Sequence, residues 1–153
     1  MPLRQELNDA LKTAMKAKDE RAVSTLRMVL AGLKDKDIAA RTKGVTDGIS
    51  DDEARTVLQN MIRQRRDSIA MYEKGGRAEL VKQESEEIAV IERFLPKQMG
   101  PDEIEAAAKA VIAELGAKDI KDMGKVMGAM KQRYAGQMDL SQVGAIVKKS
   151  LGA

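Results

Sequence analysis

The sequence contains no cysteine, histidine or tryptophan, and its aromatic residues are one phenylalanine and two tyrosines. Without thiol or imidazole groups it lacks thiol nucleophiles, Ser–His and Cys–His catalytic arrangements, and the usual ligands of structural zinc. The scarcity of aromatic side chains also disfavours nucleic-acid modules that stack bases on aromatic platforms. These absences exclude most enzyme classes, and we expect no catalytic residues, no metal site and no cofactor.

The sequence also lacks long apolar runs and a large excess of charge of one sign. No apolar run approaches the roughly 20 residues that cross a bilayer, and no apolar signal core follows the N-terminus. The 27 basic and 24 acidic residues leave a net charge of +3, which permits an anionic partner without requiring one. We therefore expect a soluble, cytoplasmic protein with no membrane partner.

What the sequence does contain is apolar residues at helical spacing. They recur with the 3.6-residue period, and no convincing alternating strand pattern is present, so we predict an all-α fold. The apolar stripes that mark the expected helices begin at Leu3, Val23, Ala54, Leu80, Ile104, Met123 and Leu140. The third and fourth helices are expected to form a long antiparallel hairpin about Gly75-Gly76.

Capping residues precede several of these stripes. Asp19 is the expected N-cap of the second helix. Ser50 and Glu53 have the spacing of a capping box, in which each side chain satisfies the backbone donor of the other residue. Asp139 and Gln142 repeat that spacing before the last helix.

Two prolines and a glycine fall between Pro96 and Pro101, where they would break any continuous helix. We therefore predict two domains, an N-terminal helical domain of residues 1–97 and a small three-helix domain of residues 98–153. The smaller part lies near the lower size limit for a core that folds alone.

One candidate ion pair links the third and fourth helices. Arg65 falls on an apolar stripe between Ile62 and Ile69, and Glu84 falls on the facing stripe. An unpaired charge that faces a core costs several kcal/mol, in order of magnitude, so each needs a partner. We predict a structural clasp between Arg65 and Glu84, with Arg27 as a candidate third member. The alternative, a catalytic cleft, has no nucleophile nearby to serve.

Two charged clusters on these helices have both a functional and a solvent-face interpretation. The acidic cluster, which would suit general acid–base work or a divalent ion, comprises Glu84, Glu86, Glu87 and Glu92. The basic cluster, which would present guanidinium forks to phosphates, comprises Arg55, Arg63, Arg66 and Lys74. For the acidic cluster we favour a solvated helix face, and for the basic cluster both interpretations stay open.

The most distinctive segment is residues 121–130, where two glycines lie four positions apart within a predicted helix. Each glycine inside a helix costs around 0.5–1 kcal/mol relative to alanine, so something is expected to approach the backbone at Gly124 and Gly128. A neighbouring helix and a sugar-phosphate chain are the two candidates. Lys121 and Lys125 flank the glycines near the helix N-terminus, where the macrodipole favours an anion. The segment lacks the Gly-Lys-Ser/Thr ending of a nucleotide phosphate loop.

Several stretches taken together resemble the YqeY-like family. They are Leu26-Arg27-Met28, residues 64–69 with Tyr72 and Gly76-Arg77, residues 94–98, and residues 123–128, followed by Gly136, Asp139 and Val143. The resemblance covers the whole chain. The C-terminal part is also similar to the tail domain of the B subunit of tRNA-dependent amidotransferases.

The resemblance implies an all-helical protein with an N-terminal helical domain and a three-helix tail. In the amidotransferase the similar tail contacts the body of the tRNA. A kinase-like body of the same subunit transfers ammonia, released from glutamine by a partner subunit, into the mischarged tRNA. This chain is too short to contain that body, so a carbon–nitrogen ligase activity would be a label inherited from the shared tail.

The predicted function is therefore non-catalytic binding of tRNA or another structured RNA through the C-terminal domain. Gly124, Lys125 and Gly128 match the tail motif that the resemblance implies. Charge and spacing add further RNA-binding candidates, which are Lys121, Lys131, Arg133, Lys148 and Lys149. The N-terminal helices would dock a protein partner or stabilise the chain. Two alternatives remain: an accessory factor that acts in trans with an amidotransferase, and a pure protein-interaction bundle.

Overall fold

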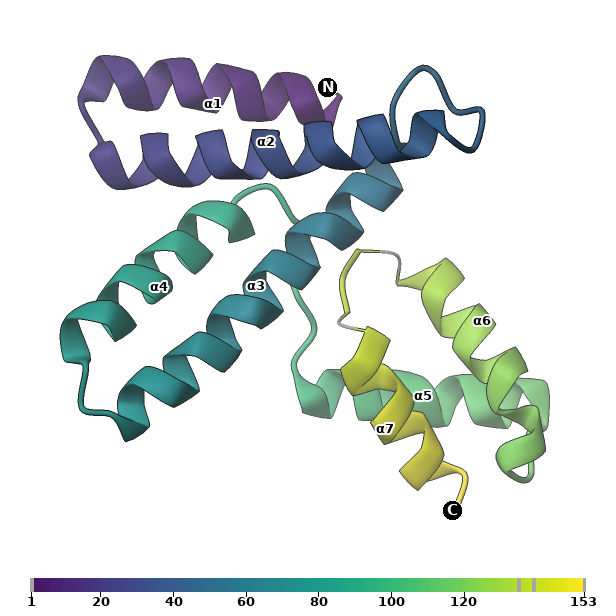
Figure 1. The fold of residues 1–153 in the computed structure, drawn as a ribbon. Helices are drawn as coiled ribbons and strands as arrows, with labels where there is room; N and C mark the ends of the chain where they lie inside the picture. The colour runs from purple at the N-terminus through teal and green to yellow at the C-terminus, as the bar shows by residue number, and fades with distance from the viewer. Residues whose placement is uncertain (1, 135, 139, 153) are drawn as a thin grey trace. The chain divides into compact units, whose positions relative to one another are not determined.

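The computed structural model describes residues 2–134, 136–138 and 140–152, and all regular structure among them is helical (Figure 1). The predicted all-α fold is confirmed for these residues. The elements are α1 (Leu3–Ala17), α2 (Glu20–Arg41), α3 (Asp51–Lys74), α4 (Ala78–Glu92), α5 (Pro101–Leu115), the short 3-10 helix η1 (Ile120–Asp122), α6 (Met123–Arg133) and α7 (Leu140–Ser150).

The chain divides into two compact units, Met1–Leu95 and Pro96–Ala153, two residues before the boundary expected from the sequence. Hydrogen bonds explain the shift. The side chain of Gln98 donates to the carbonyls of Pro96 at 2.8 Å and Gly136 at 2.7 Å, which ties Pro96 to the C-terminal unit, and the backbone N–H of Met99 donates to the carbonyl of Gln137 at 2.8 Å. The connecting segment therefore belongs to the C-terminal unit from its first residues.

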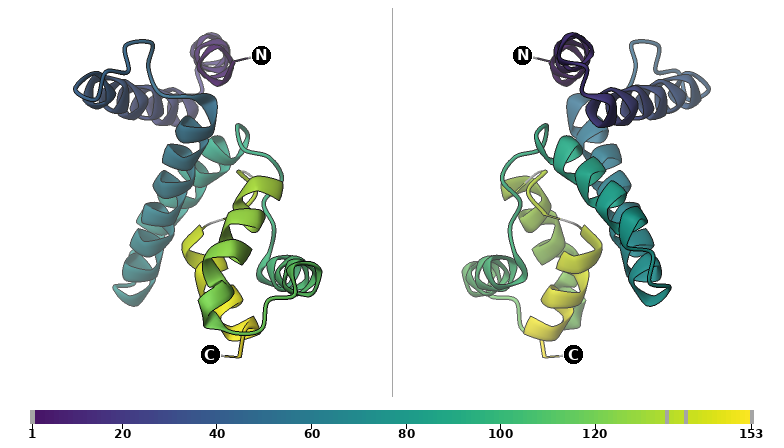
Figure 2. Two further views of the ribbon diagram at one scale, coloured as in Figure 1. Left: turned by 90° about the vertical axis from the view of Figure 1, so that its right-hand side faces the viewer. Right: turned by 90° about the vertical axis from the view of Figure 1, so that its left-hand side faces the viewer.

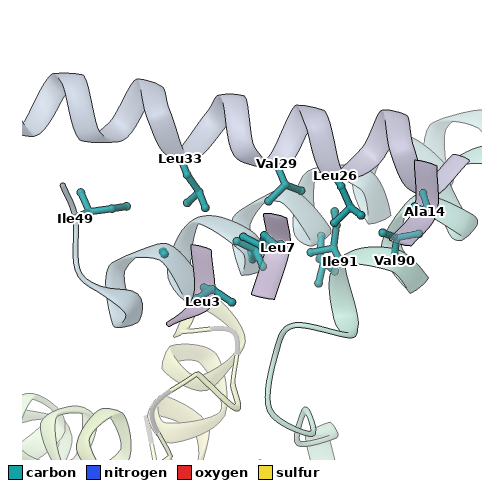
Figure 3. Packing of buried hydrophobic residues seen from close by; sticks show 13 residues of the cluster. Leu3, Leu7, Ala14, Leu26, Val29, Leu33, Ile49, Val90 and Ile91 are labelled. Carbon is teal, nitrogen blue, oxygen red and sulfur yellow. The ribbon is translucent and has the colours of Figure 1, made fainter. Parts of the chain in front are cut away.

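The N-terminal unit contains two pairs of helices. In each pair the helices lie side by side and run in opposite directions: α1 with α2, and α3 with α4 (Figures 1 and 2). Their apolar sides form one core, part of which is drawn in Figure 3. Its most deeply buried large side chains, all at most 2% exposed, are Leu3, Leu7, Leu26, Val29, Leu33, Leu58 and Ile91.

Two of the expected helix caps are present in this unit. The Asp19 carboxylate accepts the backbone N–H of Ala22 at 3.1 Å at the start of α2, which confirms the predicted N-cap. The Ser50 hydroxyl accepts the N–H of Glu53 at 3.1 Å. The Glu53 carboxylate contacts the Ser50 hydroxyl at 3.3 Å rather than its backbone N–H, so only one half of the capping box is confirmed. The second predicted capping box involves Asp139, which lies outside the described residues.

A hydrogen-bonded pair, Asp37 and Arg4, fixes the loop between α2 and α3. One carboxylate oxygen of Asp37 accepts the backbone N–H of Ile49 at 2.8 Å and also pairs with the Arg4 guanidinium. Arg4 donates in turn to the Ile49 carbonyl at 3.1 Å. Ile49 is only 8% exposed and joins the edge of the core (Figure 3). Asp37 and Arg4 thus satisfy the backbone N–H and carbonyl groups of Ile49, a buried residue that lies outside any helix.

Gly48, one residue earlier, occupies a position that only glycine fits. Its φ is +88°, and a Cβ atom would lie 2.9 Å from the Asp37 carboxylate oxygen. We expect Gly48→Ala to lower the free energy of unfolding by about 2 kcal/mol, as measured by urea denaturation. Gly44→Ala is the matched control, because Gly44 has φ +85° but no atom within 4 Å of an added Cβ. It should cost about 1 kcal/mol. Equal losses would show that the Asp37 contact contributes nothing.

The C-terminal unit packs α5, α6 and α7 around a second core, separate from the first. Its most buried side chains, all at most 1% exposed, are Ile104, Ala108, Val111, Val126, Met130, Val143 and Val147. α6 and α7 run in opposite directions, so the beginning of α6 and the end of α7 lie at the same end of this unit (Figures 1 and 2).

Candidate nucleic-acid interface

The two glycines of α6 lie on its exposed side. Val126 and Met130 turn into the core of the C-terminal unit and are both 0% exposed. Gly124 and Gly128 lie two residues before and after Val126, which places them about 200° around the helix axis from it. A Cβ atom added at either glycine would meet no heavy atom within 4 Å. Close packing against a neighbouring helix of this unit therefore does not explain the pair.

Gly32 in α2 shows the contrasting case. A Cβ atom at that position would lie 2.5 Å from the terminal methyl group of Met61 in α3. That glycine makes room for a neighbouring side chain, as helix-packing glycines do, whereas the α6 pair leaves bare backbone facing outward.

Three lysines border this bare backbone. Gly124, Gly128 and Lys131 follow one another at intervals of four and three residues, which is the spacing of a line along one side of α6, and Lys121 precedes them in η1. Lys125 lies beside this line. All three lysines are exposed, and none forms an ion pair in the part of the chain that the structure describes. We call these five residues the glycine–lysine face.

Two carboxylates reduce the positive charge at the start of the face. Asp119 accepts the N–H of Lys121 at 2.9 Å as the cap of η1, so Lys121 lies in η1, directly before α6. Asp122 accepts the N–H of Lys118 at 3.0 Å. This backbone hydrogen bond, with smaller contributions from Lys125 and Lys118, holds the pKa of Asp122 below its usual value. The carboxylate is therefore ionised at neutral pH.

Arg133 does not join the face. Its guanidinium forms a bidentate ion pair with Glu114 of α5, with N–O distances of 2.6 and 2.7 Å. The hydrogen bonds from Arg133 lower the pKa of the Glu114 carboxyl. Arg133 stays an RNA-binding candidate, but a phosphate would have to compete with the Glu114 carboxylate for its guanidinium. The crossing of α5 and α6 creates this pair, and the spacing within one helix does not reveal it.

Lys148 and Lys149 occupy the last turn of α7 and are both exposed. Because α6 and α7 run in opposite directions, these lysines lie at the end of the unit where α6 begins (Figure 1). They extend the positive charge at that end and lie away from the end that carries Lys131.

The predicted ion pair between Arg65 and Glu84 is present in the N-terminal unit, and Glu87 joins it as a closer partner. Arg65 Nε lies 3.9 Å from Glu84 but 3.1 Å from Glu87, and these side chains are 11%, 18% and 14% exposed. The guanidinium also donates to the Met61 carbonyl at 3.0 Å and contacts the Met28 sulfur at 2.9 Å. Burial, followed by the nearby Glu87 carboxylate, raises the pKa of Glu84.

The structure corrects the expected roles of Arg27 and Glu87. Arg27 is exposed and forms no ion pair in the described chain, because it lies on the outer side of α2. Members of the basic cluster have carboxylate partners, with Arg55 3.0 Å from Asp52 and Arg66 3.4 Å from Glu92. Glu87, which we assigned to a solvated face, is a principal partner of Arg65. Its position three residues after Glu84 and four before the buried Ile91 would have identified it.

Tyr72 and Arg77, which contribute to the family resemblance, both line a cavity of about 310 Å³ at the turn between α3 and α4. Arg77 pairs there with Glu79 at 3.2 Å, and both side chains are mostly exposed. Among the described residues, no three carboxylates gather closely enough to hold a metal ion. Within the same residues, no helix is long and apolar enough to cross a bilayer.

Comparison with known proteins gives relatives and a family. The chain is 36% identical over 103 residues to "Altered inheritance of mitochondria protein 41, mitochondrial" of Lachancea thermotolerans, which covers 67% of this chain and 53% of the relative. It is 34% identical over 112 residues to the protein of the same name of Kluyveromyces lactis, covering 71% and 58%. The chain thus spans little more than half the length of these relatives. Their names place them in mitochondria, whereas we expected a cytoplasmic protein. A family model described as "Yqey-like protein" matches residues 4–151, so this chain belongs to the YqeY-like family.

Proposed function

We propose that the C-terminal unit binds tRNA or another structured RNA through the glycine–lysine face of α6, by contacts with the phosphate backbone. The observation that carries the proposal is the open space around Gly124 and Gly128. Two glycines inside one helix reduce its stability by about 1–2 kcal/mol in total. Among the described residues no atom packs against either glycine to offset that cost, and a partner that approaches the bare backbone would do so.

The lysines favour a polyanion as that partner. Lys121, Lys125 and Lys131 would face the same lysines of a second copy, so charge repulsion opposes self-association through this face. Tyr134, the tyrosine nearest to α6 in sequence, packs against the core of the unit instead of offering a stacking surface. Recognition would thus depend on charge and shape rather than on the reading of bases. The proposal gives this chain a binding role and leaves covalent chemistry to other proteins.

The test measures binding of fluorescently labelled tRNA by anisotropy at low salt. Lys121→Glu combined with Lys125→Glu should weaken binding about tenfold or more, because each reversal replaces an attraction to phosphate by a repulsion. The matched control is Lys34→Glu combined with Lys36→Glu, which makes the same charge change at exposed positions of α2. The control should bind nearly as well as the wild type. Since three lysines act together, the slope of log K against log salt should be about −2 to −3.

A glycine variant separates backbone contact from charge. Gly124→Ala combined with Gly128→Ala should raise the free energy of unfolding by about 1–2 kcal/mol, because alanine is the better helix former and has free space. The same variant should bind tRNA more weakly, because the methyl groups hold the phosphates away. Stabilisation without loss of binding would contradict backbone contact. Undetectable binding by the wild type at low salt would contradict the proposal as a whole.

A further inference from the structure

We propose that Asp47-Gly48, in the loop between α2 and α3, is a site of spontaneous modification at which Asp47 converts to isoaspartate through a cyclic imide. The reaction needs a carboxyl group that can turn back on the chain and a following amide nitrogen that is not held elsewhere. The structure combines both at these two residues.

The first requirement is met by the Asp47 side chain. It is exposed, and the described part of the chain gives it no ion pair or hydrogen bond partner. In this it differs from Asp37, Asp19 and Asp122, whose carboxylates accept backbone N–H groups. The carboxyl carbon of Asp47 is thus free to approach its own main chain.

The second requirement is met by the backbone nitrogen of Gly48. No hydrogen bond of this N–H is found among the described residues, whereas the next N–H along, that of Ile49, is held by Asp37 at 2.8 Å. Gly48 has no Cβ atom to obstruct ring closure. The sequence has no other Asp-Gly pair and no Asn-Gly pair. Asp67-Ser68, by contrast, lies inside α3, where the backbone is fixed in the helical ladder.

The chemistry balances without an oxidant or a cofactor. The Gly48 nitrogen forms a bond to Cγ of Asp47, its proton is lost, and one carboxyl oxygen leaves as water. The resulting five-membered imide is opened by water at one of its two carbonyl carbons. Attack at Cγ restores aspartate. Attack at the main-chain carbonyl carbon gives isoaspartate, in which the chain runs through Cβ and Cγ.

The neighbouring structure allows the product to remain folded. The main chain becomes one atom longer just before Gly48, and the segment from Arg41 to Asp47 is exposed, so it can absorb the extra length. On the other side, Asp37 and Arg4 still hold Ile49. The free α-carboxylate of the product is the group that isoaspartyl carboxyl methyltransferases, which use S-adenosylmethionine, take as substrate.

The experiment follows oxygen exchange in the full-length protein. The protein is held near neutral pH at moderate temperature in water enriched in heavy oxygen, and it is then digested with trypsin in ordinary water. The peptide Gly44–Arg55 should gain one heavy oxygen at Asp47, and the intact protein should become a methyl acceptor for an isoaspartyl methyltransferase. The peptide Asp67–Lys74 serves as the internal control and should remain unlabelled.

Asp47→Glu is the matched variant, because it keeps the charge while ring closure would require a less favourable six-membered imide. It should lose both the label and the methyl acceptance. A synthetic peptide of residues 44–55 provides the rate for an unconstrained chain. Equal labelling of Asp47→Glu and wild type would overturn the proposal. A wild-type protein that stays unlabelled while the synthetic peptide is labelled would overturn it too.

Discussion

Arg65→Ala is expected to lower the free energy of unfolding of the N-terminal unit by about 3 kcal/mol at neutral pH, as measured by urea denaturation. The substitution leaves the carboxylates of Glu84 and Glu87 facing each other, mostly buried, without the guanidinium that lies 3.9 and 3.1 Å from them. Removing one partner of a buried charge cluster costs far more than removing an exposed pair. The contacts with the Met61 carbonyl and the Met28 sulfur are lost as well.

The loss should depend on pH. Burial raises the pKa of Glu84 in the folded protein, so the folded state binds the proton more tightly than the unfolded state. The stabilisation that comes from protonated Glu84 is fully present below the pKa of this group in the unfolded chain, and it is lost as the pH rises through its pKa in the folded protein. Without Arg65 the ionised form becomes less favourable still. The difference between the variant and the wild type should thus shrink on acidification from neutral pH toward about 4.3, the ordinary glutamate pKa.

Arg66→Ala is the control for this prediction. The Arg66 side chain does not face the core and is 59% exposed. It lies 3.4 Å from Glu92, which belongs to α4, the helix that also carries Glu84. Its removal should cost at most about 0.5 kcal/mol. Adding Glu84→Gln and Glu87→Gln to Arg65→Ala should restore part of the loss. If the two arginine variants were equally mild, the buried cluster would not hold α3 and α4 together.

Met130→Ala is expected to destabilise the C-terminal unit by about 2–5 kcal/mol. Met130 is 0% exposed at the centre of the second core, and a small unit has little stability in reserve. The N-terminal unit has its own core, so its stability should be unchanged. Hydrogen exchange measured by mass spectrometry distinguishes the units, because peptides from residues 101–152 should lose protection while those from α1 to α4 retain it.

Met71→Ala provides a control of the same residue type within a helix, because Met71 is 72% exposed. Protection should remain unchanged in both units of that variant. A loss of protection in both units of Met130→Ala would mean that the chain unfolds as one cooperative structure.

The sequence was a good guide to features that depend on neighbours along the chain. The helical period located the helices, and Asp19 and Ser50 were recognised as caps because their hydrogen bonds reach only three residues ahead. Features that depend on how helices cross were harder to predict. The Arg133–Glu114 pair joins α6 to α5, and no periodicity within either helix indicates it. The open space around Gly124 and Gly128 likewise depends on which side of α6 meets its neighbours.

Glu84 was predicted from the sequence as a partner of Arg65, whereas Glu87 was missed for a different reason. Both residues lie on the helix stripe that includes Ile91. Glu87 also belongs to the acidic cluster, however, and such a run of acidic residues is typical of a solvent-exposed helix face. In the structure the Glu87 side chain is slightly less exposed than that of Glu84, and Arg65 reaches it at the shorter distance.

The hydrogen bonds of the connecting segment have a consequence for ligands that touch both units. Leu95 is bonded back to Glu92, and Gln98 is bonded forward to Gly136, so residues 96 and 97 form the whole bridge, with a reach of roughly 7 Å. A tether this short gives a second contact an effective concentration of the order of millimolar. If each unit had a weak site for the same ligand, the two sites together would therefore bind that ligand with useful avidity.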